Sequence, residues 1–146
     1  METQTFYSNG KLLITGEYVV LDGAKALALP TKFGQSLLVK SGTNQQIKWT
    51  SFDADKSIWF EGMISFEEIK QRTINDSNSA VKNTLIEILH QAFIQNPSFL
   101  EKEGYEIETY LTFPRLWGLG TSSTLINSIA DWLDIDAFEL LQKSFG

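Results

Sequence analysis

Residues 105–124 read YEIETYLTFPRLWGLGTSST, and this stretch decides the fold class. Its first part alternates in polarity, and one of its two faces carries Tyr105, Ile107, Thr109, Leu111 and Phe113. Alternation with a period of two predicts a half-buried β-strand, which Pro114 ends. The glycine-containing segment Arg115–Gly120 predicts a loop, and the Thr and Ser residues after it predict a helix that begins near Ser122. The stretch therefore predicts a strand, a loop and a helix N-terminus in direct succession.

Strand patterns fill the first part of the chain, and helix patterns lie on both sides of residues 105–124. The expected strands are Thr5–Ser8, Leu12–Thr15, Tyr18–Leu21, Ala26–Leu29, Ser36–Lys40, Gln46–Thr50 and Ser57–Phe60. We expect Pro30 to end the fourth of these strands. Apolar residues at three- and four-residue spacing predict a helix that Asn78 or Ser79 caps and that runs to Gln95, and a shorter helix at Asp136–Lys143. Strands first and helices mostly later predict an α+β fold with a mixed or antiparallel sheet.

The composition limits the class of protein. The 146 residues include 12 Lys and Arg, 18 Asp and Glu and no Cys, which gives a net charge of −6. This length fits a single domain, residues 1–146, and the absence of Cys excludes disulfides, zinc–thiolate sites and a Cys nucleophile. The sequence has neither a bilayer-spanning apolar run nor a signal peptide, so we expect a cytoplasmic protein with no membrane partner. The acidic balance argues against nucleic acid as a partner.

The segment Gly118-Leu119-Gly120-Thr121-Ser122-Ser123 has the residue types of an anion-binding loop. Glycines let the backbone approach a ligand closely, and the first N–H groups of the following helix have no intrahelical partner. Thr121, Ser122 and Ser123 add hydroxyls that can cap the helix, bind phosphate or ligate Mg²⁺. An ordinary strand–turn–helix connection has a similar composition, and the spacing alone does not decide between the two. The segment lacks the Gly-Lys-Ser/Thr of a Walker loop and the third glycine of a dinucleotide fingerprint.

A second segment, residues 10–23, places Lys11 before an apolar strand and Gly16-Glu17 after it. Lys11 could supply positive charge to a phosphate group, and Glu17 could hold a polar group of a substrate. By themselves, the two residues are more typical of a solvated edge strand and turn than of a binding site. The functional interpretation therefore depends on the glycine segment.

Together the two segments resemble the GHMP family of small-molecule kinases, which includes galactokinase, homoserine kinase, mevalonate kinase and phosphomevalonate kinase. The family's first motif is present as Lys11, Gly16-Glu17-Tyr18 and Asp22-Gly23. Its second motif, Pro-x-x-x-Gly-Leu-Gly-Ser-Ser-Ala, is present from Pro114 to Ser123. Here Thr121 replaces the first Ser, and Ser123-Thr124 replaces the usual Ala-Ala. The resemblance covers essentially the whole chain.

The resemblance implies a two-layer, ribosomal-protein-like α+β fold with helices on one face of the sheet. It implies ATP and Mg²⁺ as cofactors and a small metabolite as phosphoryl acceptor, and the Gly-Glu-Tyr form favours mevalonate or phosphomevalonate. In this family Gly118, Leu119, Gly120, Thr121, Ser122 and Ser123 would wrap the ATP phosphates. Thr121 or Ser122 would lie on Mg²⁺. Lys11 and Glu17 would act at the phosphoryl acceptor as the catalytic residues.

Family members are longer, and they carry a catalytic Asp in a Gly-Ser-Gly-x-Asp stretch that this sequence lacks. The resemblance therefore implies an N-terminal, ATP-binding domain that ends before the catalytic Asp and the C-terminal domain, and that is inactive alone. Apolar residues that face water would then require a C-terminal segment or a second copy of the chain as partner; the expected residues are Trp132, Leu133, Phe138 and Phe145. The alternatives are a non-catalytic nucleotide-binding module and, disfavoured by the charge, an RNA-binding domain of the ribosomal type. We expect His90 to be structural.

Overall fold

The computed structural model describes residues 3–14, 27–112 and 121–145. Within these ranges one sheet has five strands in the order β1-β2-β5-β3-β4. The strands are β1 (Gln4–Ile14), β2 (Leu27–Ser41), β3 (Gln46–Phe52), β4 (Ile58–Ser65) and β5 (Tyr105–Leu111). Strands β3 and β5 pair in parallel, whereas the other neighbours pair antiparallel. The sheet is therefore mixed.

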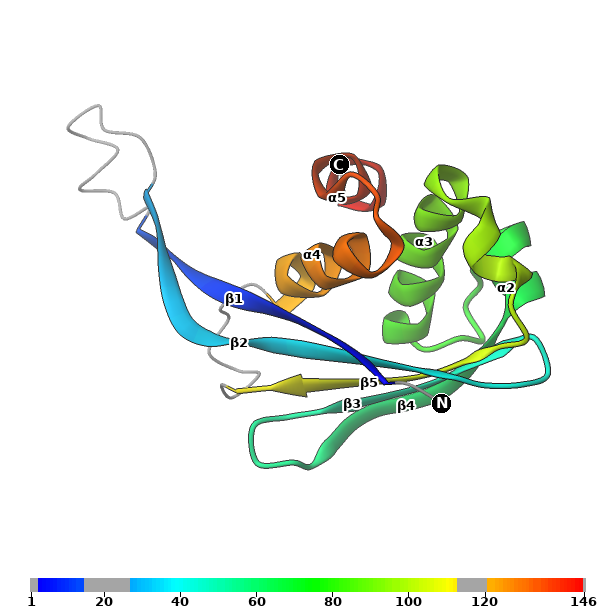
Figure 1. The fold of residues 1–146 in the computed structure, drawn as a ribbon, viewed down its shortest axis with the longest axis horizontal. Helices are drawn as coiled ribbons and strands as arrows, with labels where there is room; N and C mark the ends of the chain where they lie inside the picture. The colour runs from blue at the N-terminus through cyan, green and yellow to red at the C-terminus, as the bar shows by residue number, and fades with distance from the viewer. Residues whose placement is uncertain (1–2, 15–26, 113–120, 146) are drawn as a thin grey trace.

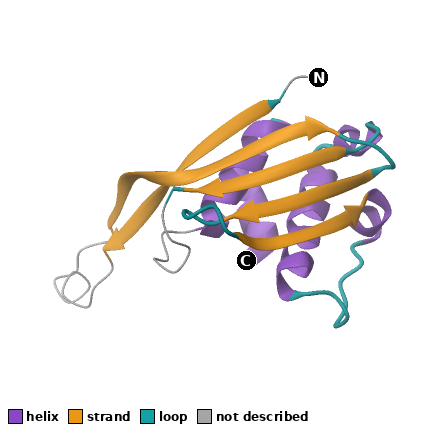
Figure 2. Ribbon diagram, turned by 90° about the horizontal axis from the view of Figure 1, so that it is seen from below, coloured by secondary structure: helices purple, strands orange, loops and turns teal. Residues whose placement is uncertain are grey.

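The helices of the described chain lie on one face of this sheet (Figure 1), and the opposite face is open in Figure 2. They are α2 (Phe66–Gln71), α3 (Ala80–Gln95), the 3-10 helix η1 (Pro97–Glu101), α4 (Thr121–Leu133) and α5 (Ala137–Phe145). Helix α4 packs on β1 and β2, α3 packs on β4, and α5 packs on α3 and α4. This arrangement confirms the expected two-layer α+β fold with helices on one face.

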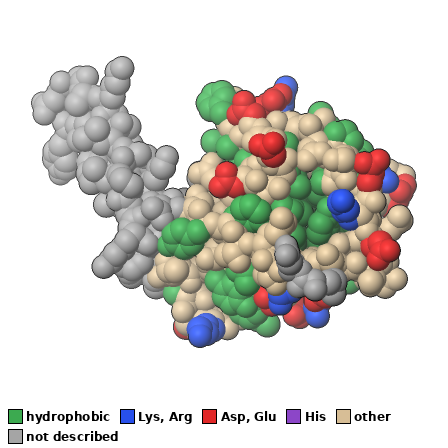
Figure 3. Space-filling model, in the orientation of Figure 1, with side chains coloured by type: hydrophobic (Ala, Val, Ile, Leu, Met, Phe, Trp, Pro, Cys, Tyr) green, Lys and Arg blue, Asp and Glu red, His purple; other side chains and the backbone are tan. Residues whose placement is uncertain are grey.

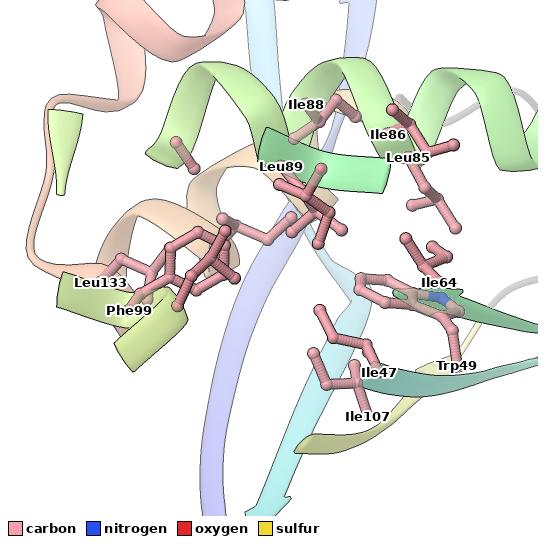
Figure 4. Close-up of a cluster of buried hydrophobic side chains, with 14 of the residues drawn as sticks. Ile47, Trp49, Ile64, Leu85, Ile86, Ile88, Leu89, Phe99, Ile107 and Leu133 are labelled. Atoms are coloured by element: carbon pink, nitrogen blue, oxygen red, sulfur yellow. The ribbon is translucent and has the colours of Figure 1, made fainter. Parts of the chain in front are cut away.

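The core lies between the sheet and α3. Alternate residues of each strand point to the helices, so Ile47 and Trp49 of β3 are buried with Ile107 of β5. Figure 4 shows the Trp49 ring beneath Leu85 and Ile86 of α3, with Phe99 and Leu133 in a second group of side chains. Of the two expected caps, Asn78 and Ser79, it is Ser79 that caps α3, because its side chain accepts a hydrogen bond from the Lys82 N–H.

The expectation that Pro30 ends a strand is wrong. Strand β2 continues through Pro30, which pairs with Lys11 of β1. Strand β5 pairs only with residues Gln35–Ser41 of β2, so the segment around Pro30 has β1 as its sole strand partner among the described residues. Proline is tolerated where one side of a strand is unpaired, because its missing N–H then leaves no ladder hydrogen bond unmade. The expected strands on either side of Pro30 are therefore one strand.

Helix α2 is absent from the elements expected from the sequence. Its six residues are too few for a helical period to show, but a capping box precedes it. The Ser65 hydroxyl accepts from the Glu68 N–H at 3.1 Å, and the Ser65 N–H donates to Glu68 Oε1 at 3.0 Å. Ser-x-x-Glu is the sequence signature of such a helix start. This signal marks α2 where periodicity does not.

Apolar residues near the C-terminus divide between surface and core. Phe138 and Phe145 of α5 are 70% and 50% exposed, as expected, and Trp132 is half-buried. The expectation that Leu133 faces water is wrong, because it is 5% exposed and belongs to the core cluster. On the face drawn in Figure 3, acidic side chains are spread over the surface rather than gathered at one place.

The helices of the described ranges include none with the length and apolar character that crossing a membrane requires.

The capping box gives a first prediction. Ser65→Ala removes the acceptor for the Glu68 N–H, and it should lower the free energy of unfolding by about 1 kcal/mol. Glu68→Gln is the comparison variant, because glutamine keeps the reciprocal hydrogen bond of the box and loses only the charge paired with Lys82. Urea unfolding followed by tryptophan fluorescence measures both variants. An equal loss of stability in the two variants would contradict the assignment of the stabilisation to the cap.

Candidate functional site

The N-terminus of α4 lies at the end of the sheet where β5 finishes. The Thr124 hydroxyl in the first turns of α4 contacts Gln35 of β2, and the Asn127 side chain donates to Ser8 Oγ of β1 at 3.4 Å. Near the other end of α4, the Trp132 ring packs edge-on against Tyr105, with 5.1 Å between the ring centroids. Tyr105 begins β5, so α4 runs back along the sheet. Its free N–H groups and positive dipole end therefore face the end of the sheet where Thr112 follows β5.

Consecutive residues of β2 hold the chain on both sides of the glycine segment. Before the segment, the Thr112 N–H donates to the Gly34 carbonyl at 2.9 Å, and the Gly34 N–H donates to Thr112 Oγ1 at 2.7 Å. After it, Thr124 Oγ1 donates to Gln35 Oε1 at 2.7 Å. Gln35 and Thr124 are 1% and 2% exposed, so this hydrogen bond is shielded from water. Thr112 and Thr124, the described residues on either side of the glycine segment in the sequence, are therefore held at one point of the sheet.

Gly34 has a steric role at this point. A Cβ atom there would lie 2.3 Å from the Ser8 carbonyl oxygen and 2.7 Å from the Tyr7 hydroxyl. Strand β1 therefore approaches β2 so closely that a larger residue would displace it. Glycine keeps β1, β2 and Thr112 in register beside the glycine segment.

A cavity of about 230 Å³ opens beside the N-terminal part of α4, between α3 and the sheet. Its walls are mainly apolar and come from β3, α3 and α4, together with Trp59 of β4; these residues are Trp49, Trp59, Val81, Leu85, Ile88 and Leu125. Cavities that bury a whole drug-sized ligand measure about 300–1,000 Å³. This cavity therefore suits one flat apolar group that belongs to a larger ligand.

The floor of the cavity is polar. Gln35 of β2, Thr109 of β5 and Ser51 of β3 line it, and each is at most 3% exposed. Thr109 and Ser51 are direct neighbours in the parallel ladder. The Trp49 indole N–H donates to Ser51 Oγ at 3.0 Å, and the Gln35 side chain accepts from Thr124. The Thr109 hydroxyl has no hydrogen-bond partner within the described part of the chain.

The structure brings some of the expected site residues to this end of the sheet. Lys11 lies in β1 opposite Pro30, beyond the pair formed by Asn9 and Gly34. The helix start Thr121, Ser122 and Ser123 forms the first turn of α4, one residue earlier than expected. Glu17 and Gly118–Gly120 lie outside the described residues, as does Trp117. The backbones of Lys11 and of the α4 N-terminus thus share one end of the sheet.

Titratable groups with clear structural partners lie elsewhere, where α2 meets α3. A hydrogen bond from the Arg72 guanidinium lowers the pKa of Glu87. Burial raises the pKa of Glu68, but hydrogen bonds from Ser65 and Lys82 outweigh it, so the pKa lies below its usual value. His90 Nδ1 lies 2.8 Å from the Ile69 carbonyl oxygen, which supports its expected structural role. No cluster of His, Cys, Asp or Glu within residues 3–14, 27–112 and 121–145 has the arrangement of a metal site.

The polar floor was not among the residues expected from the sequence. The sequence does contain a signal for it, because the helix-facing residues of three strands each include one polar residue near the same end of the sheet. These helix-facing rows are Gln35-Leu37-Val39, Ile47-Trp49-Ser51 and Ile107-Thr109-Leu111. Only the pairing register shows that these positions are neighbours, and a single sequence does not contain that register.

No protein-family model matches the sequence, and no curated protein is significantly similar to it. Solved structures do share its fold. A mevalonate kinase from Methanococcus jannaschii superposes with a TM-score of 0.68 at 16% identity, over 98% of this chain and 45% of its own. The chain has the GHMP-kinase fold. A galactokinase from Lactococcus lactis, complexed with galactose, superposes with a TM-score of 0.66 at 18% identity, over 98% of this chain and 36% of its own.

The chain thus spans less than half the length of either solved kinase. A third structure, another mevalonate kinase, superposes with a TM-score of 0.66 at 17% identity and is covered over 45% of its chain. At such identities the likeness concerns the GHMP-kinase fold alone.

The contact between Gln35 and Thr124 gives a second prediction. Thr124→Val leaves Gln35 Oε1 buried without its donor and should lower the free energy of unfolding by about 1–3 kcal/mol. Adding Gln35→Met should cost less than the sum of the two single changes, because the double variant buries no orphaned polar atom. Urea unfolding measures all three variants, with Asn127→Ala as a nearly neutral control at the longer, exposed hydrogen bond. Additive losses would contradict the coupling.

Proposed function

We propose that this chain is the ATP-binding part of a GHMP-type kinase, which transfers a phosphoryl group from ATP to a small metabolite. The observation that carries the proposal is the anchoring of the residues on either side of the glycine segment. Thr112 and Thr124, on either side of it, bond to the consecutive residues Gly34 and Gln35. The glycine segment between these two anchored residues would present backbone N–H groups to the phosphates, and prepositioned donors of this kind are what phosphoryl transfer requires of a binding site.

The phosphate groups would lie at the N-terminus of α4. Its first N–H groups have no partners within the helix, and the helix dipole adds partial positive charge there. The helix has 13 residues, long enough for this dipole to develop. The glycines of residues 118–120 would let the backbone approach the phosphate oxygens closely. A net charge of −6 does not oppose this, because backbone groups rather than a basic surface would hold the anion.

The nucleotide base would lie in the cavity between α3 and the sheet. Its apolar walls suit the faces of a flat aromatic ring, and its polar floor suits the ring edge. The cavity adjoins α4, because Leu125 of α4 lines it and Gln35 of its floor bonds to Thr124 of α4. The base and the phosphates of one nucleotide would therefore be held by neighbouring parts of the fold. This supports a nucleotide rather than a simple phosphate as the ligand.

The residues present also suit Mg²⁺. Thr121 and Ser122 stand at the helix start, and hydroxyl oxygens are ligands of the kind that Mg²⁺ accepts beside phosphates. When bound, Mg²⁺ would neutralise charge on the phosphates. Lys11 would bring a positive charge to the phosphoryl acceptor from β1, and Glu17 would order the same region. Both roles come from the resemblance of residues 10–23 to the first GHMP motif.

The proposal also includes a phosphoryl acceptor, a general base and a second domain, the last two contributed by polypeptide outside this chain. Because the chain spans 45% of the Methanococcus jannaschii mevalonate kinase, we propose that the complete site includes polypeptide beyond the part described here. Mevalonate or phosphomevalonate is our first choice of acceptor, and the cytoplasm is the compartment that we expect. A partner for exposed Phe138 and Phe145, either a C-terminal segment or a second copy, also stays a prediction.

ADP release tests the activity. The full gene product that contains this chain is assayed with Mg²⁺-ATP and mevalonate, phosphomevalonate, homoserine or galactose, in parallel with residues 1–146 alone. We expect one acceptor to support ADP release by the full product and none to do so with residues 1–146 alone. ATP binding without ADP release from any acceptor would instead favour the non-catalytic nucleotide-binding module.

A further prediction concerns the glycine segment. Gly120→Val should abolish ATP binding, because a β-branched side chain blocks the approach of the phosphates to the backbone. The unfolding temperature should change little. Isothermal titration calorimetry with Mg²⁺-ATP measures the binding, and Gly62→Ala on β4 serves as a glycine control away from the proposed phosphate site. Unchanged ATP affinity in Gly120→Val would show that the segment is an ordinary connection.

A further inference from the structure

The Thr109 hydroxyl is buried on the floor of the cavity. Thr109 is 1% exposed and lies on the helix-facing side of β5, between the apolar residues Ile107 and Leu111 of the same row. Its Oγ1 atom has no hydrogen-bond partner in the described part of the chain, although it is shielded from water. Its polar neighbour in the parallel ladder, Ser51 of β3, already accepts a hydrogen bond from the Trp49 indole, and its neighbour in β2 is the apolar Leu37.

A buried hydroxyl without a partner destabilises a folded protein, because it loses its hydrogen bonds to water and gains none in return. Valine has nearly the same shape and would fill this position without that loss. Such groups are few in native proteins, and each one requires an explanation. The position of Thr109 supplies one, because its side chain lines the cavity between α3 and the sheet.

We propose that Thr109 is a specificity-determining residue of this cavity, where its hydroxyl hydrogen-bonds to the polar edge of a purine base. The proposal rests on the proposed function, and it deepens it by naming the group that reads the base. The base faces would pack on the apolar walls, which include Trp49 and Leu85, while the ring edge points to the floor. A hydroxyl both donates and accepts, so it can pair with either kind of group on that edge.

A comparison with Gln35 shows why a change at Thr109 tests base binding separately from phosphate binding. Gln35 lines the same cavity and is bonded to Thr124 of α4, so a change there would disturb both the floor and the helix start. Thr109 lies on β5 and has no bond to α4 within the described residues. A change at Thr109 should therefore affect base binding while leaving phosphate binding intact.

The test compares three ligands by isothermal titration calorimetry: Mg²⁺-ATP, adenosine and Mg²⁺-tripolyphosphate, which has no base. Thr109→Val should weaken ATP and adenosine binding by about tenfold and leave tripolyphosphate binding unchanged. Thr109→Ser keeps the hydroxyl and should restore most of the affinity. The unfolding temperature of the ligand-free Thr109→Val chain should equal or exceed that of the wild type, because the variant removes an unpaired buried hydroxyl.

Ser128→Ala is the matched control. Ser128 is also 1% exposed with no hydrogen-bond partner among the described residues, but it does not line the cavity. It should leave the affinities for all three ligands unchanged.

The possible outcomes separate the two proposals. Equal ATP and adenosine affinities in wild type and Thr109→Val overturn the role of Thr109, and so does a parallel loss of tripolyphosphate binding or a lower unfolding temperature. If the wild-type chain binds adenosine but not tripolyphosphate, the proposed phosphate site is overturned. The adenosine affinities of wild type and Thr109→Val then decide the role of Thr109. A wild-type chain that binds neither ATP nor adenosine overturns both proposals.

Discussion

The anchoring of Thr112 and Thr124 to consecutive residues of β2 is the constraint on which the candidate site depends. Gly34 holds Thr112 through the backbone, and Gln35 holds Thr124 through a buried side-chain hydrogen bond. Both contacts require β1, β2 and β5 to be in register, and the close approach of β1 makes glycine necessary at residue 34. The pairing of the sheet thus sets the position of the α4 N-terminus, and with it the direction of the unpaired N–H groups.

The cavity beside this anchor combines an apolar wall with a polar floor, and the two have opposite effects on stability. Packing of Trp49 against α3 stabilises the fold through buried apolar area, whereas the unpaired Thr109 hydroxyl destabilises it. Proteins commonly give up some stability where a site must bind a ligand. At the α2–α3 contact, by contrast, the polar groups of Glu68, Glu87 and His90 are paired. Among the buried hydroxyls without a partner in the described residues, that of Thr109 lines the cavity, whereas those of Ser128 and Ser144 do not.

The shared fold and the local chemistry support the kinase proposal in different ways. The superposition on mevalonate kinase and galactokinase covers nearly the whole of this chain but less than half of theirs, so it describes the scaffold. The anchoring of Thr112 and Thr124 and the cavity are features of this chain itself, and they are the basis of the proposal that it binds ATP. The GHMP family, which this sequence resembles, usually has Ala at the position of Thr124. The hydrogen bond from Thr124 to the buried Gln35 gives a physical reason for the Thr in this chain.

The sequence by itself determined the fold class, helix α3 with a cap at Asn78 or Ser79, and the order of strand, glycine segment and helix start in residues 105–124. These features are local: they follow from periodicity, capping and proline over a few residues. The continuity of β2 through Pro30 and the burial of Leu133 were decided by the tertiary structure, because each depends on which distant segment lies alongside. The polar floor formed by Gln35, Ser51 and Thr109 was also decided by the tertiary structure. Three residues from three strands become one surface only through the register of the sheet, which is set by long-range pairing and not by neighbours in the chain.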